Sequence, residues 1–230
     1  MKVAIVSAMI EEIQPVIDKF GLSVIDKINN QDIYYYQHQD LEVYIFNSGI
    51  GKTNAAITTA LSINEYNFDI IINIGTSGGI NKNVMINDVV IANKLAYWDV
   101  DATAFNYEIG QVPQENKYEI IDNTEFLKWI DPLNFKYHQG LVLTGDSFID
   151  ANSFKRIEIE AFDDPLCVEM ESMAIVYTAH RLNTKIYVLR TISDNAYYDS
   201  NVEFDTYLNE VCIKYQNLFQ HLIDNYEQLK

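Results

Sequence analysis

The strongest constraint in this 230-residue chain is one apolar run that leads directly into a glycine-rich loop. The run is Phe68-Asp-Ile-Ile-Ile-Asn-Ile74, and the loop is Gly75-Thr-Ser-Gly-Gly79. A strand that is apolar on both faces is typical of the buried centre of a parallel sheet, which helices cover on both sides. Ligands of open α/β sheets gather at the carboxyl ends of such strands. The run therefore predicts an α/β protein, and the loop is a site candidate; a tight turn that needs positive φ at its glycines is the alternative.

The rest of the chain alternates strand-like and helix-like segments. From Phe204 onward, apolar residues recur at helical spacing, which predicts a long amphipathic helix at the end of the chain. The pattern predicts a single α/β domain over residues 1–230, with three α/β/α layers around a central mixed, mostly parallel sheet. The other segments that we expect are strands at 2–8, 88–92, 139–144 and 186–192, a hairpin at 33–38 and 41–47, and helices at 10–20, 55–63 and 172–182.

Charge and composition exclude several classes of protein. Acidic residues number 33 against 16 basic ones, and the net charge of −17 repels nucleic acids and anionic lipid, so we expect neither partner. The chain has two distant cysteines, Cys167 and Cys212, and no apolar run long enough to cross a membrane. We therefore expect free thiols and a soluble, cytoplasmic protein. The four histidines lack ligand spacing, so we expect no metal site.

A second loop, Gly49-Ile-Gly-Lys-Thr53, resembles part of a nucleotide-phosphate loop, because it stands between a strand and a helix. The full pattern needs a glycine five positions before Gly51, where the chain has Phe46. A loop without that glycine cannot surround a polyphosphate with its backbone amides. A nucleotide-phosphate hydrolase acting at Lys52 is therefore a weak alternative.

Three acidic segments stand at the expected strand exits. Glu12 follows the first strand, Glu169 and Glu171 precede a helix, and Asp194 ends the last strand. Each alone can be a helix cap or a solvated side chain. Together they can converge on one cleft, where Glu171 at a helix N-terminus would stay ionised, and a more enclosed Glu12 or Asp194 would handle protons. Carboxylates in distinct environments indicate glycosidic-bond chemistry.

In combination, these segments resemble the 5′-methylthioadenosine/S-adenosylhomocysteine nucleosidases. The likeness is collinear over nearly the whole chain. The wider relatives are the purine nucleoside phosphorylases, which share the fold but attack with phosphate, so the resemblance implies a single nucleoside phosphorylase-like domain over residues 1–230. The matching segments are Ala8–Glu12, Ser48–Lys52, Asn73–Gly79, Asp99–Phe105, Tyr107-Glu108 with Gly110-Gln111, Gly145–Ile149, Val168–Glu171 and Arg190–Asp194.

The resemblance implies hydrolysis, without a cofactor, of the bond between adenine and ribose in 5′-methylthioadenosine, S-adenosylhomocysteine and 5′-deoxyadenosine. By similarity, Asp194 protonates the seven-position nitrogen of adenine with support from Ser193. Glu12 activates the attacking water, which Thr76 and Arg190 help to hold. Protonation of the leaving purine is a task for a general acid.

The resemblance also assigns the substrate-binding residues. Glu171 and the backbone of Met170 bind the ribose hydroxyls, Phe148 stacks on adenine, and the backbone of Ile149 reads its Watson–Crick edge. The apolar wall around the sugar and the thioether consists of Met9, Ile50 and Phe204.

A homodimer is a further implication, with Phe105 and Pro113 reaching the 5′-substituent pocket of the neighbouring subunit. The chain departs from the family pattern at three places. Tyr97-Trp-Asp-Val-Asp101 replaces Tyr-His-Asp-Ala-Asp, Gly75-Thr-Ser-Gly78 replaces Gly-Ser-Ala-Gly, and residues 195–202 share little with the family. These differences bear on substrate preference and on a lid.

Two other functions are alternatives to that of a nucleosidase. A phosphorylase needs a basic cluster for phosphate, and Arg190 is a lone candidate in an acidic chain. A catalytically silent adenine-nucleoside-binding domain has no need of both a water-activating base and a leaving-group acid, yet the chain keeps Glu12 and Asp194. Both considerations favour hydrolysis.

Overall fold

The computed structural model describes residues 1–195 and 200–229, and over 200–209 it describes the backbone without the side chains. Every strand and helix expected from the sequence is present. The strands are β1 (Lys2–Ser7), β2 (Ser23–Ile28), β3 (Gln31–His38), β4 (Leu41–Asn47), β5 (Ile70–Gly79), β6 (Val89–Tyr97), β7 (Glu119–Ile120), β8 (Tyr137–Thr144), β9 (Pro165–Glu169) and β10 (Lys185–Asn195). The α-helices are α1 (Ile10–Phe20), α2 (Lys52–Tyr66), α3 (Thr124–Ile130), α4 (Ser172–Arg181) and α5 (Ser200–Asn225).

The strands form a mixed sheet, part of which closes on itself. β1, β4, β5 and β10 pair in parallel, and so do β6, β8 and β9. The two groups join antiparallel, β10 to β6 and β5 to β9, so that β5, β9, β8, β6 and β10 make a ring. β2 and β3 extend the sheet antiparallel beyond β4. The expected α/β class with a mixed sheet is confirmed, but the sheet is parallel only within the two groups.

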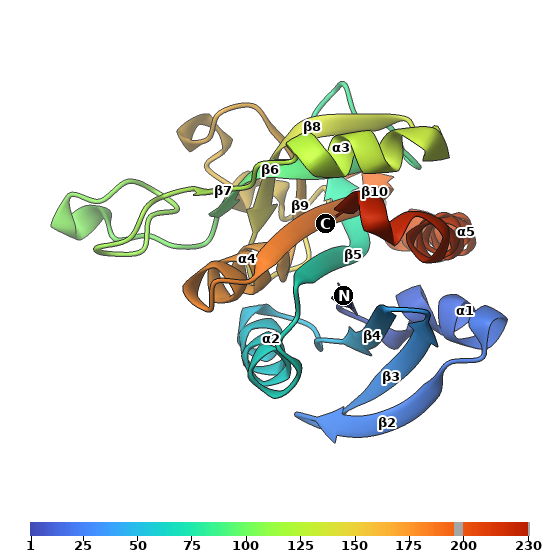
Figure 1. The fold of residues 1–230 in the computed structure, drawn as a ribbon. Helices are drawn as coiled ribbons and strands as arrows, with labels where there is room; N and C mark the ends of the chain where they lie inside the picture. The colour runs from blue at the N-terminus through green and yellow to red at the C-terminus, as the bar shows by residue number, and fades with distance from the viewer. Residues whose placement is uncertain (196–199, 230) are drawn as a thin grey trace.

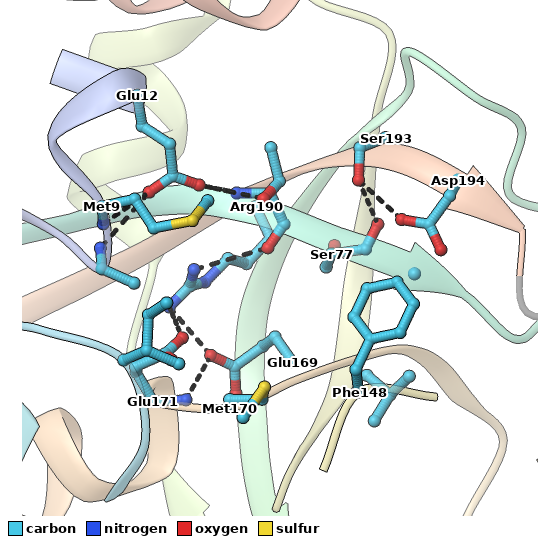
Figure 2. Close-up of a pocket in the computed structure, with 15 residues that line it drawn as sticks. Met9, Glu12, Ser77, Phe148, Glu169, Met170, Glu171, Arg190, Ser193 and Asp194 are labelled. Atoms are coloured by element: carbon cyan, nitrogen blue, oxygen red, sulfur yellow. Dashed lines mark hydrogen bonds and ion pairs between the residues drawn. The ribbon is translucent and has the colours of Figure 1, made fainter. Parts of the chain in front are cut away.

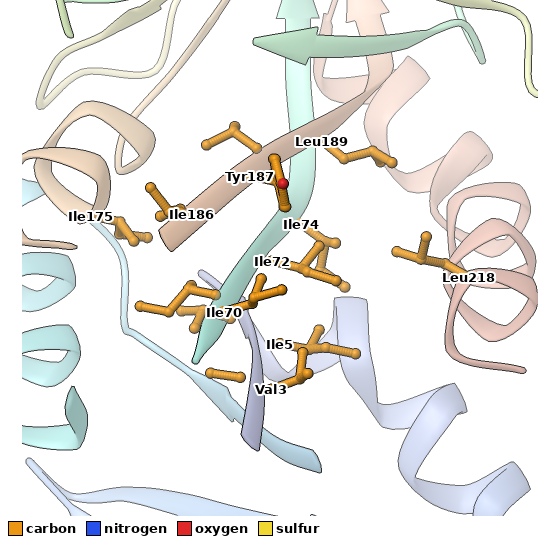
Figure 3. Packing of buried hydrophobic residues seen from close by; sticks show 14 of the residues in the cluster. Val3, Ile5, Ile70, Ile72, Ile74, Ile175, Ile186, Tyr187, Leu189 and Leu218 are labelled. Carbon is orange, nitrogen blue, oxygen red and sulfur yellow. The ribbon is translucent and has the colours of Figure 1, made fainter. Parts of the chain in front are cut away.

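Helices cover the central strands from both sides. α2 packs against α4 on one side, and α1 packs against α5 on the other (Figure 1). Figure 3 shows Ile175 of α4 and Leu218 of α5 approaching the buried side chains of β5 from opposite directions. Burial of an isoleucine such as Ile72 contributes roughly 1.5–3 kcal/mol. The apolar run that dominates the sequence is therefore the centre of the core.

The elements that the sequence pattern misses are short or exposed. β7 has two residues and β9 has five, beginning with a proline, while β2 is an edge strand with mostly exposed side chains. The connection from β6 to β7 projects from the body of the molecule and carries a short 3-10 helix at Thr103–Phe105 (Figure 1). Both cysteines are free and buried. Within the described ranges, no helix has the length and apolar character that a membrane crossing needs.

Candidate active site

A cavity of about 360 Å³ lies where β1, β5, β9 and β10 reach their carboxyl ends. The structure brings the three acidic segments together here. Glu12 and Asp194 face the cavity from opposite sides, and Glu171 approaches from a third direction (Figure 2). All three carboxylates are buried, with exposed fractions of 1–4%. The predicted residues that line the cavity are Met9, Glu12, Ile50, Thr76, Phe148, Met170, Glu171, Arg190, Ser193 and Asp194.

Glu12 is held by donors from two strand ends. Its Oε1 accepts hydrogen bonds from the amide (2.8 Å) and the hydroxyl (2.9 Å) of Thr76. Its Oε2 accepts longer bonds, each 3.3 Å, from the amides of Ala8 and Met9, which precede α1. An ionised carboxylate acts only as an acceptor, so these contacts suit that form. They fix the carboxylate at the first turn of α1, at the edge of the cavity.

Arg190 is a fully buried cation beneath the cavity. Its Nη2 forms an ion pair with Glu169 at 2.8 Å and lies 3.9 Å from Glu171. The guanidinium also donates to Ser172, to Asn73 and, at 3.4 Å, to the carbonyl of Thr76. Burial lowers the pKa of Arg190, but the charges of Glu169, Glu171 and Glu12 outweigh it and raise that pKa above its ordinary value. Arg190 is thus committed to protein partners.

The two neighbouring glutamates of β9 and α4 have different roles. Glu169 accepts hydrogen bonds from the amides of Glu171 (2.9 Å) and Ser172 (2.7 Å) at the start of α4. It also accepts one from the hydroxyl of Thr144. Glu171 instead accepts the amide of Gly51 at 2.9 Å. Burial, followed by the charge of Glu169, raises the pKa of Glu171 to about 7. The expectation that the helix terminus stabilises the charge of Glu171 was wrong, because Glu169 accepts the amides of that terminus and the pKa of Glu171 is raised.

Asp194 lies at the other end of the cavity. Its Oδ1 accepts the hydroxyl of Ser193 at 2.7 Å. A side chain at Gly78 would place its Cβ 3.2 Å from Asp194 Oδ2, so the glycine keeps this end open. Phe148 lies on the same side of the cavity and is half-exposed (Figure 2). Asp194 can therefore meet a flat ring that enters beside Phe148.

The Gly49–Thr53 loop is filled by carboxylates. Glu171 accepts the amide of Gly51, and Asp146 accepts the amide of Lys52 at 2.8 Å. The ammonium of Lys52 donates to both carboxylate oxygens of Asp99, at 2.7 and 2.8 Å. A phosphate at this helix terminus would displace these anions, which counts against the nucleotide-phosphate alternative.

Three predicted residues do not line the cavity, and the side chain of a fourth is not described. Ile149 is buried beside it and borders an adjoining space of about 30 Å³. Phe105 is 75% exposed, and like Pro113 it belongs to the projecting connection, away from the cavity of its own chain. The side chain of Phe204 lies outside the described part of the structure.

Several lining residues were not predicted. Ser77, Gly78, Val168 and Glu169 border the cavity. They belong to the glycine-rich segment and to the acidic segment already singled out. The expectation that residues 75–79 form a loop or a tight turn was wrong, because β5 continues to Gly79 and stays paired with β10. In the described part of the chain, no group of three or more His, Cys, Asp or Glu side chains could hold a metal ion.

Comparison with known proteins shows the family of this chain. The Phosphorylase superfamily model matches residues 2–226. The 5′-methylthioadenosine/S-adenosylhomocysteine nucleosidase of an Exiguobacterium species is 36% identical, covering 99% of this chain and 100% of the relative. Two solved nucleosidase structures are also similar. That of Neisseria meningitidis, in complex with methylthio-immucillin-A, has a TM-score of 0.86 and 30% identity, covering 96% of this chain and 98% of the other. That of Streptococcus pneumoniae, with a transition-state inhibitor, has a TM-score of 0.85 and 33% identity, covering 97% and 98%.

Proposed function

This chain belongs to the 5′-methylthioadenosine/S-adenosylhomocysteine nucleosidase family and is a hydrolase acting on N-glycosyl bonds, and we propose that it releases adenine from 5′-substituted adenosines. The substrates are 5′-methylthioadenosine, S-adenosylhomocysteine and 5′-deoxyadenosine. One observation carries the proposal: Glu12 and Asp194 face a single cavity from opposite sides, with Glu171 beside it (Figure 2).

In the proposed reaction, adenine lies against Phe148 with its seven-position nitrogen toward Asp194. Proton transfer from Asp194 makes adenine a neutral leaving group, and Ser193 orients the acid through its 2.7 Å hydrogen bond. Glu12 takes a proton from water on the opposite side of the sugar. An acid and a base on opposite sides of the reacting carbon suit direct displacement by water.

Glu171 is the proposed ribose-binding residue. Its carboxylate approaches the cavity from a third direction, next to Met170 (Figure 2). In that position it can accept hydrogen bonds from the sugar hydroxyls and offset the positive charge that develops on the sugar. Met9 and Ile50 supply the apolar wall for the 5′-substituent.

Electrostatics favour water over phosphate as the nucleophile. Arg190 is the one cation among the described residues that line the cavity, and Glu169, Ser172 and Asn73 already engage it. A phosphate ion would therefore face several carboxylates without an available cation. A neutral water molecule meets no such barrier.

The proposal includes a homodimer in which the projecting connection completes the neighbouring site. Phe105 is 75% exposed and does not line the cavity of its own chain. A large apolar side chain at the tip of a projection is suited to contact a second surface. Together with Pro113, it would close the 5′-substituent pocket of the partner.

Product analysis tests the proposed reaction. The protein is incubated with 5′-methylthioadenosine in phosphate-free buffer, and we expect adenine and 5-methylthioribose. Turnover that requires added phosphate and yields a ribose 1-phosphate would make the protein a phosphorylase. Binding of the nucleoside without any product would make it a silent binding domain.

A further inference from the structure

Tyr215 of α5 forms a buried double hydrogen bond with a residue 140 positions earlier in the chain. Its hydroxyl donates to the carbonyl oxygen of Gly75 at 2.6 Å and accepts from the amide of the same residue at 3.0 Å. The side chain is 1% exposed and does not line the cavity. A single hydroxyl therefore forms hydrogen bonds with both the amide and the carbonyl of Gly75 in β5.

The sheet explains why Gly75 needs this partner. β1 pairs with β5 only as far as Asn73, and then the chain turns into α1, whereas β10 stays paired with β5 as far as Gly79. Gly75 has thus lost its strand neighbour on the β1 side. A buried amide or carbonyl left without a partner costs about 1–3 kcal/mol. The Tyr215 hydroxyl replaces the missing strand.

Gly75 is connected directly to the Glu12 end of the site. The next residue, Thr76, donates its amide and its hydroxyl to Glu12. Arg190 packs against Gly75 so closely that a Cβ there would lie 2.0 Å from Nη1. A shift of this backbone would move both Thr76 and Arg190, and with them the carboxylate of Glu12.

Helix α5 also contacts the segment that carries Glu12. Cys212, one turn before Tyr215, places its Sγ 3.5 Å from the carbonyl oxygen of Glu11, and α1 packs along α5 (Figure 1). The same helix therefore holds both halves of the Glu12 environment, the α1 terminus and the end of β5.

We propose that Tyr215 is a positioning residue for water activation, acting through Gly75 and Thr76 on the orientation of Glu12. This inference rests on the proposed function. Tyr215 does not line the cavity; it keeps the donors of Thr76 aimed at the carboxylate. A displacement of reacting groups by about 1 Å can cost two orders of magnitude in rate, so the loss of the hydroxyl should reduce kcat more than it reduces binding.

The test is the substitution Tyr215→Phe, which removes the hydroxyl and keeps the ring. We expect kcat for 5′-methylthioadenosine to fall about 10-fold or more, with KM and the dissociation constant of adenine within about threefold of the wild type. The matched control is Tyr187→Phe, which alters another buried tyrosine, stacked on Phe126 outside the cavity lining. Its kcat should be unchanged.

A double-mutant cycle distinguishes positioning from general loosening. If Tyr215 acts through Thr76, Tyr215→Phe should cost less in a Thr76→Ala background, which lacks the hydroxyl donor but keeps the amide donor, than in the wild type, because coupled residues are not additive. Full additivity, an unchanged kcat, or an equal loss of adenine affinity would overturn the inference.

A second variant covers the case in which Tyr215→Phe does not fold. Replacement of Tyr215 by 4-aminophenylalanine keeps a donor for the Gly75 carbonyl but offers a poor acceptor to the Gly75 amide. A reduced kcat with unchanged adenine affinity supports the role, and an unchanged kcat refutes it. Wild-type protein that releases no adenine without phosphate would instead refute the proposed function itself.

Discussion

Replacement of Glu171 by glutamine should stabilise the folded protein at alkaline pH while impairing its function. The Glu171 side chain is 4% exposed, and burial together with the charge of Glu169 raises its pKa from 4.5 to about 7. The folded protein therefore keeps a proton that the unfolded chain releases between these values. Stability from this group is present at low pH and is lost as the pH rises through 7.

The magnitude follows from the two pKa values. Their difference corresponds to about 3 kcal/mol of lost stability at pH 8 and to less than about 1 kcal/mol at pH 5. In Glu171→Gln the amide oxygen can still accept the hydrogen bond from Gly51, but no charge is buried. The variant should therefore gain up to about 3 kcal/mol at pH 8, or roughly 6–12 °C in Tm for a chain of this size.

Thermal unfolding at pH 5 and pH 8 measures this effect, with Glu169→Gln as the matched control. Glu169 forms an ion pair with Arg190 at 2.8 Å and caps α4, so its neutralisation should lower Tm at pH 8. The two substitutions change the same chemical group two residues apart and should act in opposite directions. A Tm for Glu171→Gln that is lower than that of the wild type at pH 8 would refute the reasoning.

Three further predictions concern activity. Asp194→Asn should lower turnover by about two orders of magnitude, as expected for a lost general acid, with an unchanged circular dichroism spectrum; an unchanged rate would remove Asp194 from the mechanism. Phe148→Ala should weaken adenine binding about 10-fold by calorimetry, since stacking contributes about 1–3 kcal/mol; equal affinity would argue against stacking. Phe105→Ala should raise KM for 5′-methylthioadenosine, and exchange of subunits with Asp194→Asn protein should restore sites of wild-type KM if the residue acts on its neighbour. No recovery would argue against a shared site.

Much of the fold was predictable because its centre has an unambiguous pattern. The run 68–74 is nearly continuously apolar and does not alternate with polar residues. A strand with this pattern is typically buried between two layers of helices. Once β5 is central, the ends of its parallel neighbours must lie beside Gly75–Gly79. The meeting of Glu12 and Asp194 at one cavity is a consequence of this geometry.

Closure of the sheet was not predictable from local patterns. β10 has 11 residues and pairs with β5 along its length, but it also pairs with β6 over Leu189–Thr191. A register shift between Ile192 and Asp194 accompanies this double pairing. Local hydrophobicity indicates that a segment is a strand, while the choice of neighbours depends on contacts between distant segments. The sequence pattern alone therefore suggested an ordinary layered sheet.

The separate roles of Glu169 and Glu171 were hidden for a related reason. Both residues stand before α4, and either could have capped it on sequence grounds. The distinction depends on Gly51, which precedes α2, and on Arg190 of β10. Gly51 donates to Glu171, while Arg190 lies closer to Glu169, at 2.8 Å, than to Glu171, at 3.9 Å. Residues that are distant in the sequence therefore determine which of the two glutamates has its negative charge offset.

The resulting distribution of charge bears on how binding energy can be used. Glu12 has four hydrogen-bond donors, and Glu169 has a close cation and a helix terminus. Glu171 has one hydrogen bond, from the amide of Gly51, a more distant Arg190 at 3.9 Å and a raised pKa. A neutral substrate does little to stabilise the negative charge of Glu171. In the proposed reaction the sugar gains positive charge during bond cleavage, so its attraction to Glu171 strengthens as the transition state forms. An interaction that is stronger in the transition state than in the ground state accelerates the reaction, and in the proposed reaction the incompletely offset charge of Glu171 would provide it.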